Sequence, residues 1–157
     1  LGDLTKMQIN ELALEINQLY GDEIIPSNLI ARLIDGVPSY DLAPSAELRE
    51  AQVDPMKWGY HDWLLTRITT FPTRNLNAYI DDYLADRLEP TLKTMLKHYG
   101  LDKKEAFFQD LNWFIRLLDN NVFKRIQMPP IVTISRGAFG TDYRETQTKI
   151  EDYLRQH

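Results

Sequence analysis

The chain has 157 residues, of which 43% are hydrophobic and 26% charged, and it carries a formal net charge of −5. This length is enough to bury about two-thirds of the unfolded surface in one core, and the patterned apolar content excludes a disordered chain. The absence of cysteine excludes disulfides, thiolate metal sites and a thiol nucleophile, so any site must use oxygen or imidazole ligands.

Two helices are predicted at the start of the chain. Thr5 can cap the first, which runs to about Tyr20 and stops at Gly21. Ser27 can cap a short second helix that ends at Gly36. Each has an apolar face that we expect to be buried. These faces hold Ile9, Leu12, Ile16, Leu19 and Tyr20 in the first helix and Leu29, Ile30, Leu33 and Ile34 in the second.

A loop with two prolines follows over residues 37–44, and Ser45 can cap a short helix to about Gln52. Residues 37–54 are therefore the best candidate for a weak internal boundary. Asp54-Pro55 is a start signal for a helix to about residue 70, because Asp caps the first turn and Pro suits its first position. Trp58 lies off the apolar stripe of that helix and is expected to face a neighbour or solvent. The stripe consists of Met56, Tyr60, Trp63, Leu64 and Ile68.

A long apolar-periodic segment runs from Thr73 to Tyr99, and Pro90 interrupts it. Because proline removes a ladder bond and clashes with the preceding turn, we expect a kink or a restart near Glu89. Gly100 ends the segment.

The next helix is predicted over residues 103–119, with Asp102 and Glu105 in the spacing of a capping box. Phe108 and Trp113 lie beside its inner stripe and widen the apolar surface, which indicates contacts on two sides. The inner stripe consists of Phe107, Leu111, Phe114, Ile115 and Leu118.

The last part of the chain changes character after residue 121. Residues 131–134 are the only plausible strand, within an extended segment near residues 128–139, and Thr141 can cap a polar final helix. The fold class predicted is all-α: one domain over residues 1–157, a bundle of about six or seven helices with this one extended segment. The strand has no partner within the chain, so it lies across the bundle, pairs with a second copy or serves as an edge for a peptide.

Three acidic residues, Asp82, Asp86 and Glu89, recur at spacings of four and three and would share one face of a continuous helix. Such a face could hold Mg²⁺, because hard cations favour carboxylate oxygens and helical enzymes acting on pyrophosphates gather acids from facing helices. A Mg-dependent phosphohydrolase-type enzyme using Asp82 and Asp86 is therefore one alternative. A solvated helix surface explains the same charges, and we expect no metal and no cofactor.

Histidine offers no ligand motif, since His61, His98 and His157 are far apart and lack H-x-x-x-H spacing. His61 could transfer a proton in a pocket, but the simpler interpretation is a hydrogen-bonded structural histidine. No residue set is predicted to be catalytic.

Nucleic-acid binding is the other alternative. The first two predicted helices could form a helix-turn-helix, although the second offers only Asn28 and Arg32 to a DNA groove. Lysines 93, 97, 103 and 104 gather near one helix end, but interspersed acids indicate a screened surface. The other possible nucleic-acid contacts are Lys124, Arg125, Arg136 and Arg144.

The function predicted is a non-enzymatic protein–protein interaction module, a bacterial-type regulatory or accessory protein that forms a homodimer. The cysteine-free sequence permits a reducing cytoplasm, where we expect it. No run approaches the roughly 20 apolar residues of a membrane-spanning helix, and the first residues lack the features of a signal peptide. The residues predicted for the interface are Ile131, Ile134, Phe139 and Tyr153.

Overall fold

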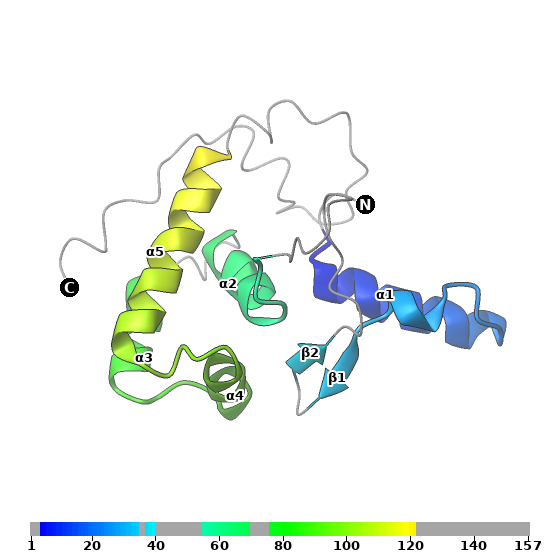
Figure 1. The fold of residues 1–157 in the computed structure, drawn as a ribbon, viewed down its shortest axis with the longest axis horizontal. Coiled ribbons are helices and arrows are strands. Elements are labelled where there is room, and N and C mark those ends of the chain that lie inside the picture. Colours follow the sequence, from blue (N-terminus) through cyan, green and yellow to red (C-terminus); the bar gives the residue numbers. More distant parts are fainter. Residues whose placement is uncertain (1–3, 35–36, 40–54, 70–75, 122–157) are drawn as a thin grey trace.

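The computed structural model describes residues 4–34, 37–39, 55–69 and 76–121, and most of these are helical. Five α-helices lie in this part of the chain (Figure 1), so a bundle of six or seven is not seen within it. The extended segment near residues 128–139 and the final helix fall outside it, as does most of the predicted boundary region. The elements are α1 (Lys6–Tyr20), the 3-10 helix η1 (Ser27–Leu29), β1 (Arg32–Ile34), β2 (Val37–Ser39), α2 (Tyr60–Thr69), α3 (Leu76–Leu84), α4 (Pro90–His98) and α5 (Lys104–Asn120).

Helix α1 begins and ends as predicted. The Thr5 hydroxyl accepts the backbone N–H of Gln8 at 3.3 Å, and the Gln8 side-chain oxygen accepts the Thr5 N–H at 2.9 Å. These two bonds form a capping box. Gly21 ends the helix with φ of 65°, a left-handed conformation that costs glycine little.

The predicted second helix is wrong. Residues Ser27–Leu29 form a single 3-10 turn, and Arg32–Ile34 then pair antiparallel with Val37–Ser39. A short apolar run fits a helix or a strand equally well, so periodicity alone could not separate them. The hairpin also corrects the expectation that residues 131–134 were the only strand, and the described fold is mostly helical rather than all-α.

Helix α2 begins at Tyr60, five residues later than the Asp54-Pro55 signal predicts. Gly59, just before it, has a φ of 79°, which interrupts any helix that started at Pro55. The Gly59 N–H donates to Oδ2 of Asp62 at 3.0 Å, so a side chain inside the first turn satisfies it.

Helices α3 and α4 divide the long predicted segment as Pro90 requires. Helix α4 restarts with Pro90 in its first turn and Glu89 as its N-cap, and the predicted restart is confirmed. The capping box predicted for α5 is wrong, because Lys103 is the N-cap and no side chain bonds there. The helix itself matches the predicted residues 103–119 to within one residue at each end.

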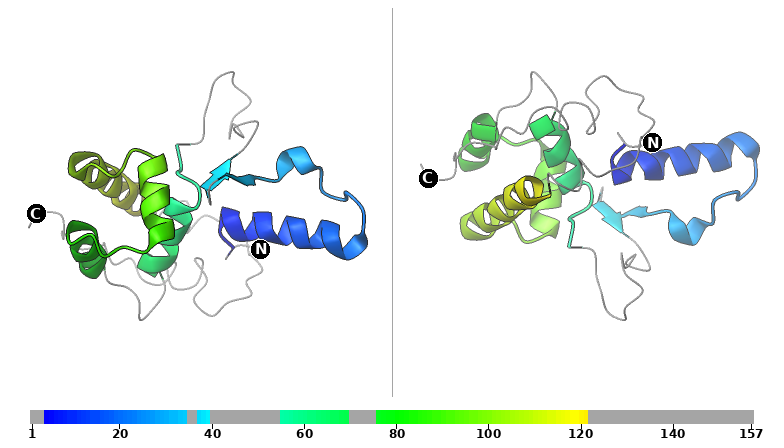
Figure 2. Two further views of the ribbon diagram at one scale, coloured as in Figure 1. Left: turned by 90° about the horizontal axis from the view of Figure 1, so that it is seen from below. Right: turned by 90° about the horizontal axis from the view of Figure 1, so that it is seen from above.

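Helices α2 to α5 enclose one apolar cluster, which we call the helical core (Figure 2). The Tyr83 and Phe107 rings stack at 3.6 Å between centroids, and the Tyr79 hydroxyl donates to the Tyr60 hydroxyl at 3.3 Å. The predicted inner stripe of α5 is buried in this core apart from Leu118, which packs partly against it. The cluster consists of Tyr60, Leu64, Ile68, Leu76, Tyr79, Ile80, Leu92, Leu96, Leu101, Phe107, Leu111, Phe114 and Ile115.

Candidate functional site

Helix α1 and the chain that returns along it, residues 21–31, project from the helical core as an arm (Figures 1 and 2). Two asparagines seven residues apart bind this return segment to α1. The Asn10 amide accepts the Ala31 N–H at 2.6 Å and donates to the Ala31 carbonyl at 3.3 Å. The Asn17 amide makes the same pair of bonds to Ile25, both at 2.8 Å. Each carboxamide therefore bonds to one residue as a backbone peptide would in a β-ladder, and the two pairs of bonds hold the return segment alongside α1 on either side of the 3-10 turn η1.

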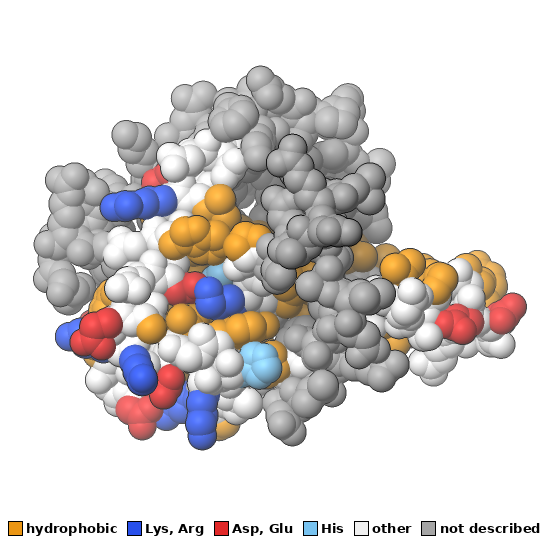
Figure 3. Space-filling view, viewed as in Figure 1, with side chains coloured by type: hydrophobic (Ala, Val, Ile, Leu, Met, Phe, Trp, Pro, Cys, Tyr) orange, Lys and Arg blue, Asp and Glu red, His pale blue; other side chains and the backbone are white. Residues whose placement is uncertain are grey.

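The apolar stripe of α1 faces away from these bonds. Ile9, Leu12 and Leu19 are 48%, 40% and 79% exposed, and Ile16 is half-buried. The expectation that this face is buried is therefore wrong. The buried residues of α1 are Asn10 and Ala13, on the side that the return segment covers. Figure 3 shows hydrophobic side chains exposed along the arm with acidic side chains beside them.

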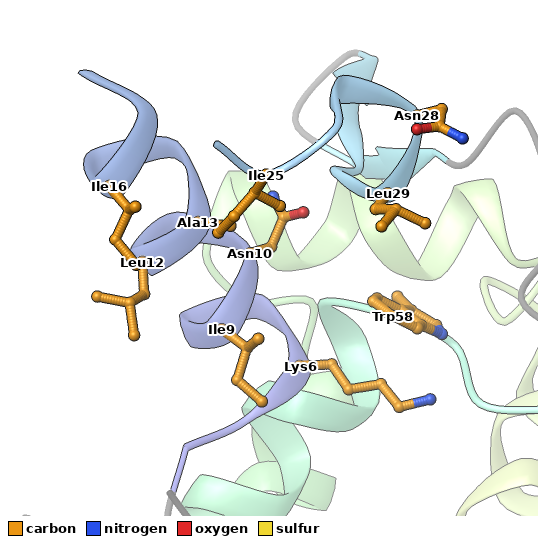
Figure 4. Close-up of a pocket in the computed structure, with 10 residues that line it drawn as sticks. All are labelled: Lys6, Ile9, Asn10, Leu12, Ala13, Ile16, Ile25, Asn28, Leu29 and Trp58. Carbon is orange, nitrogen blue, oxygen red and sulfur yellow. The ribbon is translucent and has the colours of Figure 1, made fainter. Parts of the chain in front are cut away.

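A groove of about 550 Å³ lies along this stripe, between α1, the return segment and Trp58 (Figure 4). Leu29, which is 66% exposed, lies beside Trp58 across the groove from Ile9. We call this site the α1 groove. Its lining residues are Lys6, Ile9, Asn10, Leu12, Ala13, Ile16, Ile25, Asn28, Leu29 and Trp58.

One end of the α1 groove is anchored to the helical core. The backbone N–H of Lys6 donates to Oδ1 of Asp62 at 3.0 Å, and Lys6 Nζ lies 4.4 Å from the centroid of the Trp58 ring. The Tyr99 hydroxyl donates to the Trp58 carbonyl at 2.8 Å, which fixes the backbone at the tryptophan. Trp58 is thus half-buried against a neighbour, which is one of the two positions expected for it.

A second candidate site is the polar cluster of Lys57, His61 and Asp110, in which His61 and Asp110 are buried and Lys57 is partly exposed. The Nδ1 atom of His61 accepts the Lys57 N–H at 2.9 Å, and Nε2 lies 2.9 Å from Oδ2 of Asp110. Lys57 Nζ donates to the other oxygen of Asp110. Burial raises the pKa of Asp110, but the hydrogen bonds from His61 and Lys57 outweigh it and hold that pKa below its ordinary value of 3.8.

The histidine of this cluster is held firmly in place. The His61 side chain is 1% exposed, and both of its ring nitrogens have partners within the protein. The ring packs between Trp113 and Phe114, with centroids at 5.6 and 4.8 Å. His61 itself offers no free ring nitrogen to a substrate, whereas Lys57 and Asp110 line an open pocket beside Tyr99 and Trp113.

The acidic residues proposed for Mg²⁺ do not share a helix face. Helix α3 ends before Asp86, which has a φ of 56°, and Glu89 is the N-cap of α4. Asp82 pairs with Arg87 at 3.0 Å and Asp86 with Lys93 at 2.8 Å. The break that Pro90 imposes overturns the predicted common helix face, while an enzyme that uses Asp82 and Asp86 with Mg²⁺ stays a prediction. Among the described residues no three His, Cys, Asp or Glu side chains are placed to hold a metal.

The remaining predicted site residues belong to the part of the chain beyond residue 121, outside the described ranges. Of the lysines predicted to gather near one helix end, Lys93 pairs with Asp86. Nζ of Lys104 lies 5.9 Å from the centroid of the Phe108 ring. Figure 3 shows basic and acidic side chains interspersed over this part of the core. The residues outside the described ranges are Ile131, Ile134, Phe139 and Tyr153 for the interface and Lys124, Arg125, Arg136 and Arg144 for nucleic acid.

Sequence reasoning missed Asn10, Asn17, Lys57 and Asp110. The two asparagines carried a signal, since a spacing of seven puts them on one side of α1. Asp110 also carried one, because it occupies an inner position of the α5 stripe, three residues after Phe107. Lys57 carried none, because its contact with Asp110 spans 53 residues of sequence.

Comparison with protein-family models, with curated proteins and with solved structures finds no match for this chain. None of the helices in the described ranges is long and apolar enough to cross a lipid bilayer. Function is therefore inferred from the geometry of the described residues.

Proposed function

We propose that this chain is a non-enzymatic protein–protein interaction module that docks an amphipathic α-helix of a protein partner in the α1 groove. The observation that carries this proposal is the exposed apolar stripe of α1. A helix with its apolar residues on one side normally buries that side against another element. Here Ile9, Leu12 and Leu19 remain exposed while Asn10 and Ala13 take the buried positions.

The chemistry of the groove selects the kind of partner. Aliphatic side chains from α1 and Leu29 form its walls, and the indole of Trp58 lies at one end. In helix-in-groove recognition, the bound helix places apolar side chains three, four and seven residues apart on one face. Such a row of side chains can lie along the α1 groove. The exposed Ile9, Leu12 and Leu29 side chains, with the partly exposed Trp58 beside them, also match the composition of surfaces that bind proteins.

The test is site-specific photo-cross-linking from the full chain. A photoreactive residue replaces Leu12, inside the groove, or Leu14, which has similar exposure on the same helix but does not line the groove. We expect a covalent adduct to a helical segment of a protein from position 12 and little from position 14. The partner is identified by mass spectrometry, and the complex is then rebuilt from purified components.

In the rebuilt complex, Leu12→Glu should weaken binding by roughly tenfold or more, because a charge would replace an apolar contact. Equal adducts from both positions, or a rebuilt complex indifferent to Leu12→Glu, would contradict the proposal.

The regulatory or accessory role and the cytoplasmic location stay predictions. So does a homodimer formed through Ile131, Ile134, Phe139 and Tyr153.

A further inference from the structure

The exposed stripe of α1 has the heptad spacing of a two-helix seam. Ile9, Leu12, Ile16 and Leu19 are separated by three, four and three residues, so isoleucine occupies both a positions and leucine both d positions. The pattern continues over the whole exposed length of α1, a helix of 15 residues. A seam of this kind is complementary to a copy of itself, because a and d side chains of one helix fill the spaces between those of the other.

The side of α1 that lies next to this seam is already occupied. Asn10 and Asn17 share one heptad position and bind the return segment, which holds α1 helical without help from the seam. An isolated helix of this length would be marginal in water. The two pairs of asparagine bonds, which we call the Asn10 and Asn17 clamps, therefore present a helix that is already formed. Pairing does not have to supply the free energy of folding α1.

We infer that α1 pairs antiparallel with α1 of a second copy of this chain. This inference rests on the proposed function and names the helix that enters the α1 groove. In each view the helical core lies beyond the N-terminal end of α1 and on both sides of its axis (Figures 1 and 2). A parallel pair would bring the two cores into the same space. An antiparallel pair, related by a two-fold axis across the middle of α1, places them at opposite ends.

The antiparallel arrangement gives two kinds of layer. Ile9 packs against Leu19 of the second copy, and Leu12 packs against Ile16 of the second copy. The heptad positions that flank the seam after Ile9 are Ala13, Glu15 and Tyr20, and only Glu15 is charged. Because Glu15 is exposed, solvent screens its repulsion from Glu15 of the second copy. The seam itself holds no charge, and the pair should survive high salt.

The first experiment measures the mass of the full chain by analytical ultracentrifugation, from low micromolar to near-millimolar concentration. We expect a monomer–dimer equilibrium that salt does not abolish. Leu12→Glu and Leu19→Glu should each weaken the dimer by roughly tenfold to a hundredfold, because each removes a buried leucine and adds two charges per dimer. Leu14→Glu is the matched control, since Leu14 is 51% exposed but lies off the seam, and it should leave the equilibrium unchanged.

Circular dichroism of each variant checks that α1 stays folded. A monomer at every concentration, or a dimer that Leu12→Glu and Leu14→Glu weaken equally, overturns the inference.

Disulfide trapping tests the direction of the pair, because the chain has no cysteine of its own. A mixture of the Leu12→Cys and Ile16→Cys variants should form a linked heterodimer on mild oxidation. Either variant alone should link far less. Efficient linking of Leu12→Cys to itself would place two like d positions opposite each other, and so would overturn the antiparallel arrangement.

Failure of this inference can be separated from failure of the proposed function. If the chain is monomeric but position 12 cross-links to a different protein, self-pairing is wrong and the docking function stands. If position 12 forms no adduct with any protein and the chain is monomeric, both are wrong.

Discussion

At the scale of single residues, the hydrogen bonds of His61 determine its tautomer. A backbone N–H can only donate, so Nδ1 of His61, which accepts the Lys57 N–H, carries no proton. The ring proton is therefore on Nε2 and points at Asp110. Asp110 in turn accepts from both His61 and Lys57, one bond to each oxygen. One buried carboxylate thus ties α5 to the segment that leads into α2.

Asp110→Asn should destabilise the helical core. The amide has one oxygen, so it must point its NH₂ group at one of the two donors and leave that donor unsatisfied. We expect a loss of about 1–3 kcal/mol in the free energy of unfolding at neutral pH, measured by urea titration. Glu105→Gln, an exposed change on the same helix, is the control and should cost little. Equal losses would mean that the buried carboxylate contributes nothing special.

The same variant tests the acid limb of stability. Because the pKa of Asp110 is held below 3.8 in the folded protein, the unfolded chain takes up the proton first as pH falls. The stabilisation from Asp110 is fully present above that ordinary value and is lost as pH falls below it. The difference in stability between the wild-type chain and Asp110→Asn should therefore shrink as pH falls below that ordinary value. A difference that stays constant there would show that Asp110 is not the group responsible.

At the scale of elements, side-chain bonds rather than propensity decide the structure of residues 21–31. An apolar run that suited a helix forms only a 3-10 turn over Ser27–Leu29, and two asparagine amides of α1 bind the backbone on either side of it, at Ile25 and Ala31. A buried backbone group needs a partner, and these amides supply both a donor and an acceptor at each point. The break between α3 and α4 is the opposite case. Pro90 acts only on its own helix, so its position in the sequence is enough to predict the break.

The two clamps should be separable by hydrogen exchange. Asn10→Ala removes the acceptor of the Ala31 N–H, and the exchange of that amide should accelerate by about tenfold or more. The Ile25 amide should keep its protection in this variant. Asn17→Ala should produce the reverse pattern, so each variant is the control for the other. Simultaneous loss at both amides in either variant would mean that the return segment opens as one unit.

At the scale of the whole molecule, burial is concentrated in the helical core, and the α1 arm contributes a surface. Among the described residues, those of the core cluster all come from positions 60–115, whereas α1 and the return segment supply most of the large exposed hydrophobic side chains. Stability and binding are therefore carried by different parts of the chain. Leu111 is fully buried, while Leu14 is 51% exposed.

Two leucine substitutions test this division. Leu111→Ala should lower the free energy of unfolding by about 2–5 kcal/mol, because it removes buried methyl groups and leaves a cavity. Leu14→Ala should change it by less than about 0.5 kcal/mol. Chemical denaturation followed by circular dichroism gives both values. Comparable costs would show that α1 belongs to the same core.

The sequence by itself determined the features that depend on neighbours along the chain: the Thr5 cap of α1, its glycine stop, the restart at Pro90 and the inner stripe of α5. Each depends on contacts within about one helical turn. Only the tertiary structure decided which apolar stripes are buried, because periodicity specifies a face but not what covers it. Thus α5 is buried in the helical core, whereas the equally regular stripe of α1 is exposed. The contact of Asn10 with Ala31 spans 21 residues of sequence, and that of Lys57 with Asp110 spans 53. A pattern among neighbouring residues cannot predict contacts over such separations.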